Sequence, residues 1–115
     1  MILDMYLYSK KGKHDTPVEI GFWWKHSNLH NHIENIWRNR KNTGDFNAVY
    51  CKLTEKNIYE IINKSKNDSF DSKNYKFEIF FCRSGAHQNK DTIDIMQQAL
   101  QEIRSGKSIY YFPYY

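Results

Sequence analysis

The sequence has little of what marks several large classes of protein. Among 115 residues there are only two cysteines, and each of them, Cys51 and Cys82, falls inside a predicted strand. We therefore expect buried thiols and not a disulfide framework, which indicates an intracellular chain. No hydrophobic run approaches the roughly 20 residues that span a bilayer. No cationic segment followed by a hydrophobic one stands at the start, so we expect no secretory signal.

Motifs that support nucleotide-dependent catalysis are also missing. The five glycines are not arranged as a phosphate-binding loop, and no nucleophile elbow holds a serine. No internal repeat or low-complexity tract is visible. The length fits one domain covering residues 1–115, large enough for a modest core.

Aromatic and positively charged side chains are abundant. Aromatic residues make up 17% of the sequence, with nine tyrosines and seven phenylalanines, and the formal net charge is +4. So many rings either build the core or leave ring surface for binding. The mild positive charge suits anionic partners such as nucleotides, nucleic acid or acidic protein surfaces. The basic residues are spread along the chain, which argues against a dedicated DNA-binding arm.

The hydrophobic periodicity predicts five strands and three helices. The strands are expected at residues 2–9, 18–25, 46–53, 75–82 and 108–112. The helices are expected at residues 28–40, from 54 up to a polar loop at 63–74, and at 89–105. An opening hairpin followed by alternating helices and strands predicts an α+β fold, in which three helices pack on one face of a mostly antiparallel sheet of about five strands.

The stretch from Gly21 to Trp37 is the candidate site. Its period-two part predicts a strand whose buried face carries Val18, Ile20, Phe22 and Trp24, and whose less buried face carries Glu19, Gly21, Trp23 and Lys25. Trp23 is then free to stack on a base, and Lys25 lies beside a helix N-terminus that attracts anions. Ser27 or Asn28 is expected to cap that helix. The alternative is that these tryptophans are core or interface residues.

Three histidines lie in the same stretch. His26, His30 and Glu34 are spaced by four residues, which can align two imidazoles and a carboxylate on a metal. However, His26 precedes the helix and no cysteine is near, so we expect no metal. His30 is predicted to form a hydrogen bond with a ligand. Two other roles for His30 stay open, a catalytic one and a hydrogen bond within the core.

A second candidate anion site is the loop that follows the strand at residues 75–82. Arg83 and Ser84 stand before a glycine, where backbone N–H groups and a guanidinium can hold a phosphate. The alternative is an ordinary turn, which is the usual role of such a glycine.

Short motifs along most of the chain carry a resemblance to a family. They are Leu3-Asp4-Met5-Tyr6-Leu7, Gly21, Phe22, Trp23, Lys25, Leu29-His30, Phe80-Phe81, Ser84, Asp91-Thr92-Ile93, Ala99-Leu100 and Tyr110-Tyr111. In order and spacing they resemble short tailed-phage proteins with no assigned function, some of which carry an automatic phosphoglycerate kinase label. We reject that label for this chain because the kinase fold needs two nucleotide-type α/β domains. The chain departs from the family at Arg83, where glycine is frequent, and in a shorter segment after the first strand.

The resemblance implies a protein of the infected bacterial cytoplasm. Together with the rings and charges, it leads us to expect a homo-oligomeric protein that binds and sequesters a phosphorylated, nucleotide-type molecule, as a counter-defence against a bacterial immune signal. The expected ligand-binding residues are Trp23, Lys25, His30, Arg83 and Ser84, with no metal and no cofactor. Three alternatives stay open: an inhibitor that binds a host defence complex, a small hydrolase acting on a nucleotide, and a structural or morphogenetic part of a phage. For the hydrolase, Ser84, His30 and Asp4 or Asp91 supply the residue types but no local frame.

Overall fold

The fold was analysed in a computed structural model that describes residues 3–70 and 86–115. In chain order the elements are β1 (Asp4–Lys10), β2 (Val18–Trp24), α1 (Ser27–Asn39), β3 (Cys51–Leu53), α2 (Glu55–Asn67), α3 (Ala86–Arg104) and β4 (Ser108–Tyr114). The strands of this part of the chain form one sheet in the order β2-β1-β4-β3, and every neighbouring pair is antiparallel.

The predicted α+β class is confirmed, but the strand count is wrong. The sheet has four strands within the described ranges, where about five were expected. The strand predicted at residues 75–82 lies outside those ranges. The strand predicted at 46–53 is reduced to Cys51–Leu53. Among the described residues no helix is long and hydrophobic enough to cross a bilayer.

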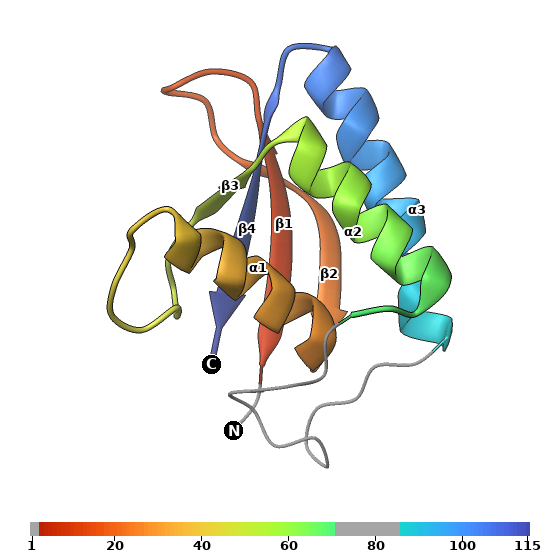
Figure 1. The fold of residues 1–115 in the computed structure, drawn as a ribbon. Helices are drawn as coiled ribbons and strands as arrows, with labels where there is room; N and C mark the ends of the chain where they lie inside the picture. Colours follow the sequence, from red (N-terminus) through yellow and green to blue (C-terminus); the bar gives the residue numbers. More distant parts are fainter. Residues whose placement is uncertain (1–2, 71–85) are drawn as a thin grey trace.

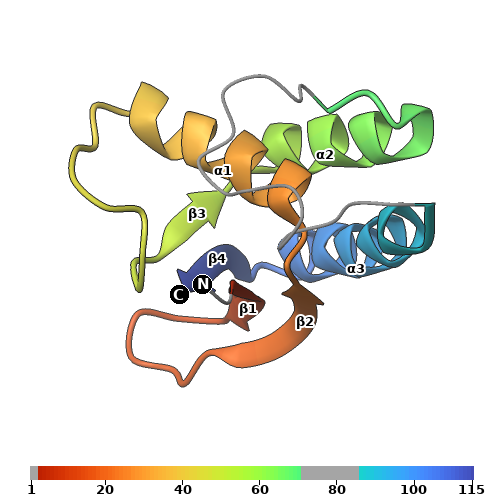
Figure 2. The ribbon, with the colours of Figure 1, turned by 90° about the horizontal axis from the view of Figure 1, so that it is seen from below.

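All three helices lie on the same side of the sheet (Figure 1, Figure 2). The odd-numbered residues of β1 and β4 face the helices. Two of them, Leu7 and Tyr111, are completely buried. Side chains of a strand alternate between its two faces. The even-numbered residues of β1 and β4 are therefore on the opposite face, which is only half-buried.

Helix α2 begins after Thr54, where the sequence predicted its start. Thr54 is its N-cap: its hydroxyl accepts a hydrogen bond from the Asn57 N–H at 3.2 Å, and the Asn57 side chain accepts one from the Thr54 N–H at 3.0 Å. This reciprocal capping box satisfies two backbone donors that have no partner inside the helix. By contrast, α1 is preceded by His26 at the N-cap and has no side-chain cap, so the cap predicted at Ser27 or Asn28 is wrong.

The buried and exposed faces predicted for β2 are also wrong. Gly21 and Trp23 point into the core, whereas Phe22 and Trp24 are 46% and 54% exposed. Val18, predicted to be buried, is likewise exposed. From Gly21 to Trp24 the residues alternate between buried and exposed, as predicted, but each lies on the face opposite to the predicted one.

A β-bulge explains the reversal. Gly21 is paired with Leu7 of β1, but Glu19 is paired with Tyr8, so Ile20 is an additional residue with no partner of its own. One extra residue moves every later side chain to the other face. Ile20 still packs against the core, so a simple alternation from residue 18 to residue 24 does not exist.

At Gly21, α3 approaches the sheet closely. A Cβ atom on Gly21 would lie 2.4 Å from Cγ2 of Ile95, closer than any real contact. We therefore expect Gly21→Ala to lower the free energy of unfolding by about 1–3 kcal/mol through overpacking. Urea denaturation measures this loss. Combining it with Ile95→Ala should recover part of the loss, because the two sites share one contact; strict additivity would contradict the packing account.

Candidate functional site

The predicted site has three residues within the described ranges, namely Trp23, Lys25 and His30. Arg83 and Ser84 lie outside them. The prediction requires an indole, an ammonium and an imidazole to open onto one water-accessible hollow. The three described residues are therefore considered first, one at a time.

Trp23 is part of the core and is 3% exposed. Its indole N–H donates to the Thr92 hydroxyl on α3 at 2.8 Å, and that hydroxyl donates to the Gln88 carbonyl at 2.7 Å. A buried indole needs a partner for its N–H, and α3 supplies it. In this arrangement the ring of Trp23 offers no face on which a base from solvent can stack.

His30 is fully buried on α1. Its Nδ1 and the Tyr111 hydroxyl share a hydrogen bond of 2.7 Å, and its ring stacks on Phe46 with centroids 5.3 Å apart. On the other side, Nε2 lies 3.6 Å from Oε1 of Glu34. Of the roles left open for His30 by the sequence, this geometry fits a hydrogen-bonded core histidine.

The polar groups around His30 extend to the surface. Burial raises the pKa of the Tyr111 hydroxyl well above its usual value, which keeps the hydroxyl protonated. Glu34 also accepts a hydrogen bond from Nε of the half-exposed Arg38 at 2.7 Å. A charge-assisted contact of this kind compensates the carboxylate for its loss of water. The row from Tyr111 to Arg38 therefore stabilises α1 against the sheet.

Lys25 is partly exposed and stays available to a ligand. It has a left-handed backbone with φ of 58°, and its N–H donates to the Leu3 carbonyl at 2.9 Å. The turn brings its Nζ to 4.2 Å from the ring centroid of Trp24. The indole beside this ammonium is thus the exposed Trp24 and not the buried Trp23. A shared hollow at Trp23, Lys25 and His30 is not formed.

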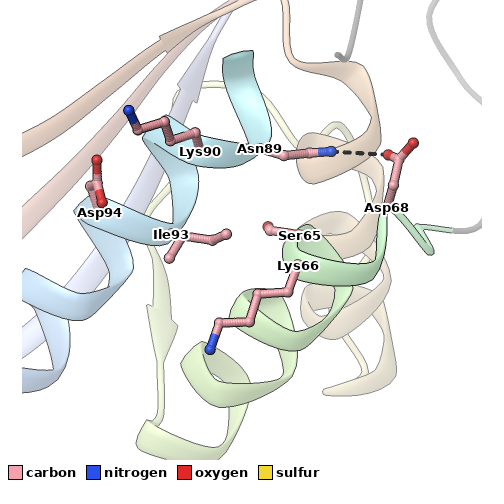
Figure 3. A pocket seen from close by; sticks show the side chains of 7 residues that line it. All are labelled: Ser65, Lys66, Asp68, Asn89, Lys90, Ile93 and Asp94. Carbon is pink, nitrogen blue, oxygen red and sulfur yellow. Dashed lines mark hydrogen bonds between the residues drawn. The ribbon is translucent and has the colours of Figure 1, made fainter. Parts of the chain in front are cut away.

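A cleft lies between α2 and α3 (Figure 3). It has a volume of about 400 Å³ and is lined by Ser65, Lys66, Asp68, Asn89, Lys90, Ile93 and Asp94. Inside it, the buried Ser65 Oγ and Asn89 Oδ1 have no hydrogen-bond partner in the described structure. Two lysines are balanced by two aspartates, so the lining attracts an anion only weakly. Ordered water can satisfy the two oxygens.

The second feature is a continuous aromatic surface on the side of the sheet opposite the helices. We call it the open aromatic face, and its residues are Tyr6, Tyr8, Phe22, Trp24, Tyr50, Tyr110, Phe112 and Tyr114. Three of them are more than half exposed, with Trp24 and Tyr50 at 54% and Tyr114 at 57%. Contiguous exposed hydrophobic patches on a protein surface mark interaction sites.

Strand register places these rings in rows across the sheet. Tyr6 of β1 lies between Phe22 of β2 and Phe112 of β4. The next row on the same face contains Tyr8 and Tyr110. Neighbouring rings are in contact: the centroids of Phe22 and Tyr6 are 5.3 Å apart.

The sequence contains a signal for this face. Aromatic residues occupy alternate positions in the first and last strands, at residues 6, 8, 110, 112 and 114. In a strand such positions share one face. Whether that face is covered depends on which side the helices pack, and only the structure provides this information.

No protein-family model, no curated protein and no solved structure matches this chain.

Proposed function

We propose that the chain binds a phosphorylated, base-containing ligand, and that the ligand lies on the open aromatic face. The observation that carries the proposal is a set of contacting, partly exposed rings on a sheet face that none of the described helices covers. Aromatic side chains stack on bases because every base has a flat π-face. This proposal keeps the ligand class expected from the sequence and moves the site from Trp23 and His30 to the other side of the sheet.

Trp24 and Lys25 form the best-defined corner of this site. The ammonium of Lys25 lies over the indole of Trp24, an arrangement stabilised by the negative charge of the ring face. A base stacked near Trp24 would bring its phosphate within reach of that ammonium. Of the predicted ligand residues, Lys25 is the one that the proposal retains.

The biological role that we propose is the one implied by the resemblance to tailed-phage proteins. A phage protein with such a site would sequester a nucleotide that the host produces as an immune signal. Sequestration needs binding and no chemistry, which agrees with a site made of rings and ammonium groups.

Calorimetry with cyclic and ADP-ribose-type nucleotides tests the proposal. A stacked base is worth about 1–3 kcal/mol, so Trp24→Ala should weaken binding by roughly 5- to 150-fold. The matched control is Tyr59→Ala, which removes a tyrosine of similar exposure from α2, away from the sheet face. Failure of every nucleotide to bind more tightly than about 1 mM, or equal losses in both variants, would contradict the proposal.

A protein partner is the second candidate, because tryptophan and tyrosine dominate the binding energy of protein interfaces. The exposed Trp24, Tyr50 and Tyr114 fit an interface as well as they fit a base. Purification of the chain from host lysate distinguishes the two. A partner that is lost with Trp24→Ala but kept with Lys25→Ala, together with no nucleotide binding, would favour the host-defence inhibitor.

A further inference from the structure

The open aromatic face is larger than one nucleotide requires. From Phe22, contacts between ring centroids lead to Tyr6 at 5.3 Å, to Tyr8 at 6.0 Å and to Tyr50 at 6.1 Å. The chain of rings thus begins on β2, crosses β1 and reaches the residue that precedes β3.

Phe112 and Tyr110 of β4 close the gap between these rings. Phe112 lies 6.4 Å from Tyr8 and 4.7 Å from Tyr50, and Tyr110 lies 6.1 Å from Tyr50. Six rings are therefore connected without a break. Four strands about 4.8 Å apart give a width of roughly 14 Å, and the seven residues of β1 give a length of roughly 20 Å. One base covers only part of this surface.

Positive charge lies around the rings. The exposed Lys52 of β3 lies beside Tyr110 of β4 in the sheet. Lys10, at the end of β1, lies beside Ser108. At the other end of the face, the ammonium of Lys25 lies over the Trp24 ring. The carboxylates on the same face belong to Asp4 and Glu19, and Glu19 raises the pKa of Tyr8 together with the burial of its ring.

The positions of these charges define where phosphates can lie. The two carboxylates belong to the first two strands, since Asp4 is in β1 and Glu19 is in the edge strand β2. Lys52 lies in β3, on the β3–β4 side of the face. Lys10 is the last residue of β1, and the turn that follows it contains two more lysines, at positions 11 and 13. Phosphates can therefore lie at three places around the rings: beside Lys52 on the β3 edge, beside Lys10 at the turn that follows β1, and beside Lys25 at the end of β2.

From this arrangement, and resting on the proposed function, we infer that the ligand of the open aromatic face is a single-stranded nucleic acid segment with two or three stacked bases. Four-stranded sheets that bind single strands stack two or three bases on their aromatic residues in this way. Stacking on rings is tolerant of base sequence, and a groove or border of positive charge holds the backbone. A duplex keeps its bases stacked on one another and so cannot use the rings.

Fluorescence anisotropy with labelled oligothymidylates of one, two, four and eight nucleotides tests the inference. Affinity should rise at least tenfold from the mononucleotide to the tetranucleotide and then level off. With three lysines contacting phosphates, a change from 50 to 200 mM salt should weaken tetranucleotide binding by about 18-fold. A parallel oligouridylate series distinguishes RNA from DNA as the source of the ligand.

Matched variants separate stacking from charge. Tyr50→Leu should weaken tetranucleotide binding at least fivefold, and Lys52→Ala should reduce its salt dependence. Tyr59→Leu and Lys56→Ala on α2 are the controls, since both residues are exposed on a helix and should leave binding unchanged. A circular dichroism spectrum equal to that of the unaltered protein shows that each variant is folded.

Five results would overturn the inference. If the mononucleotide binds as tightly as the octanucleotide, the strand is not the ligand, although the proposed function stands. If neither binds, both proposals fail. If octathymidylate annealed to octaadenylate binds as well as the single strand, or if the oligonucleotides bind equally to Tyr50→Leu, the rings are not stacking on bases. Self-association through the face, seen by sedimentation and unaffected by oligonucleotide, would identify a second copy as the occupant instead.

Discussion

Trp23→Ala is expected to lower the free energy of unfolding by about 3–5 kcal/mol, the usual cost of removing a buried aromatic ring. Trp23 is 3% exposed and its N–H donates to Thr92 of α3, so the change leaves a cavity where α3 packs on β2. Trp23→Phe keeps most of the ring and loses the hydrogen bond, which should cost about 1 kcal/mol. Urea denaturation followed by circular dichroism measures both losses.

The neighbouring tryptophan provides the control. Trp24 is 54% exposed on the other side of the strand, so Trp24→Ala should change stability by less than about 1 kcal/mol, as for most surface positions. The sequence-based prediction assigned these two residues the opposite way, with Trp24 in the core. Equal losses for the two variants, or a larger loss for Trp24→Ala, would contradict the strand register described here.

Stability should also fall on acidification because of His26. This side chain is completely buried at the N-cap of α1. Burial lowers its pKa from 6.5 to about 4, and the Asp68 carboxylate opposes this only in part. Since the unfolded chain then takes up the proton first, the contribution of His26 is complete above pH 6.5 and is lost as the pH falls to about 4. The loss is about 3 kcal/mol.

Variants isolate this effect from the titration of carboxylates. His26→Gln should remove most of the fall between pH 7 and pH 4, whereas His14→Gln, at an exposed position, should leave it unchanged. His32 adds to the fall in the same direction, because burial also lowers its pKa. Identical pH profiles for His26→Gln and the unaltered protein would show that the imidazole is not buried in its neutral form.

The sequence was sufficient to predict most local structure. Helical periods predicted three helices, and Thr54 stands at the predicted start of α2, where its hydroxyl caps the helix. These signals depend on residues a few positions apart, so one chain contains them completely. The α+β class followed from the order of the elements.

The faces of β2 were not predictable in the same way. A bulge at Ile20 reverses the phase of the strand, and no local residue pattern announces it. Gly21 was assigned to the less buried face, but it lies in the core because Ile95 of α3 occupies the space of a side chain. That contact joins residues 74 positions apart, and only the packed structure reveals it.

The burial of two candidate site residues was not predictable for the same reason. Trp23 and His30 were expected to open onto solvent, and each instead has a partner distant in sequence, Thr92 for the indole and Tyr111 for the imidazole. A tryptophan or histidine is equally suited to a ligand and to a hydrogen bond in the core, so residue type does not decide between them. Burial decides, and burial depends on the whole fold.

A nuclear magnetic resonance titration tests the central claim most directly, with ring signals of tyrosine and phenylalanine assigned and ADP-ribose and tetrathymidylate added separately. We predict that at least one of the two shifts the ring signals of Tyr6, Tyr8 and Phe112 on the open aromatic face, while the backbone signals of Ser65 and Asn89 in the α2–α3 cleft stay in place. Shifts confined to the cleft, or no shift at millimolar ligand, would contradict the assignment of the sheet face as the binding surface.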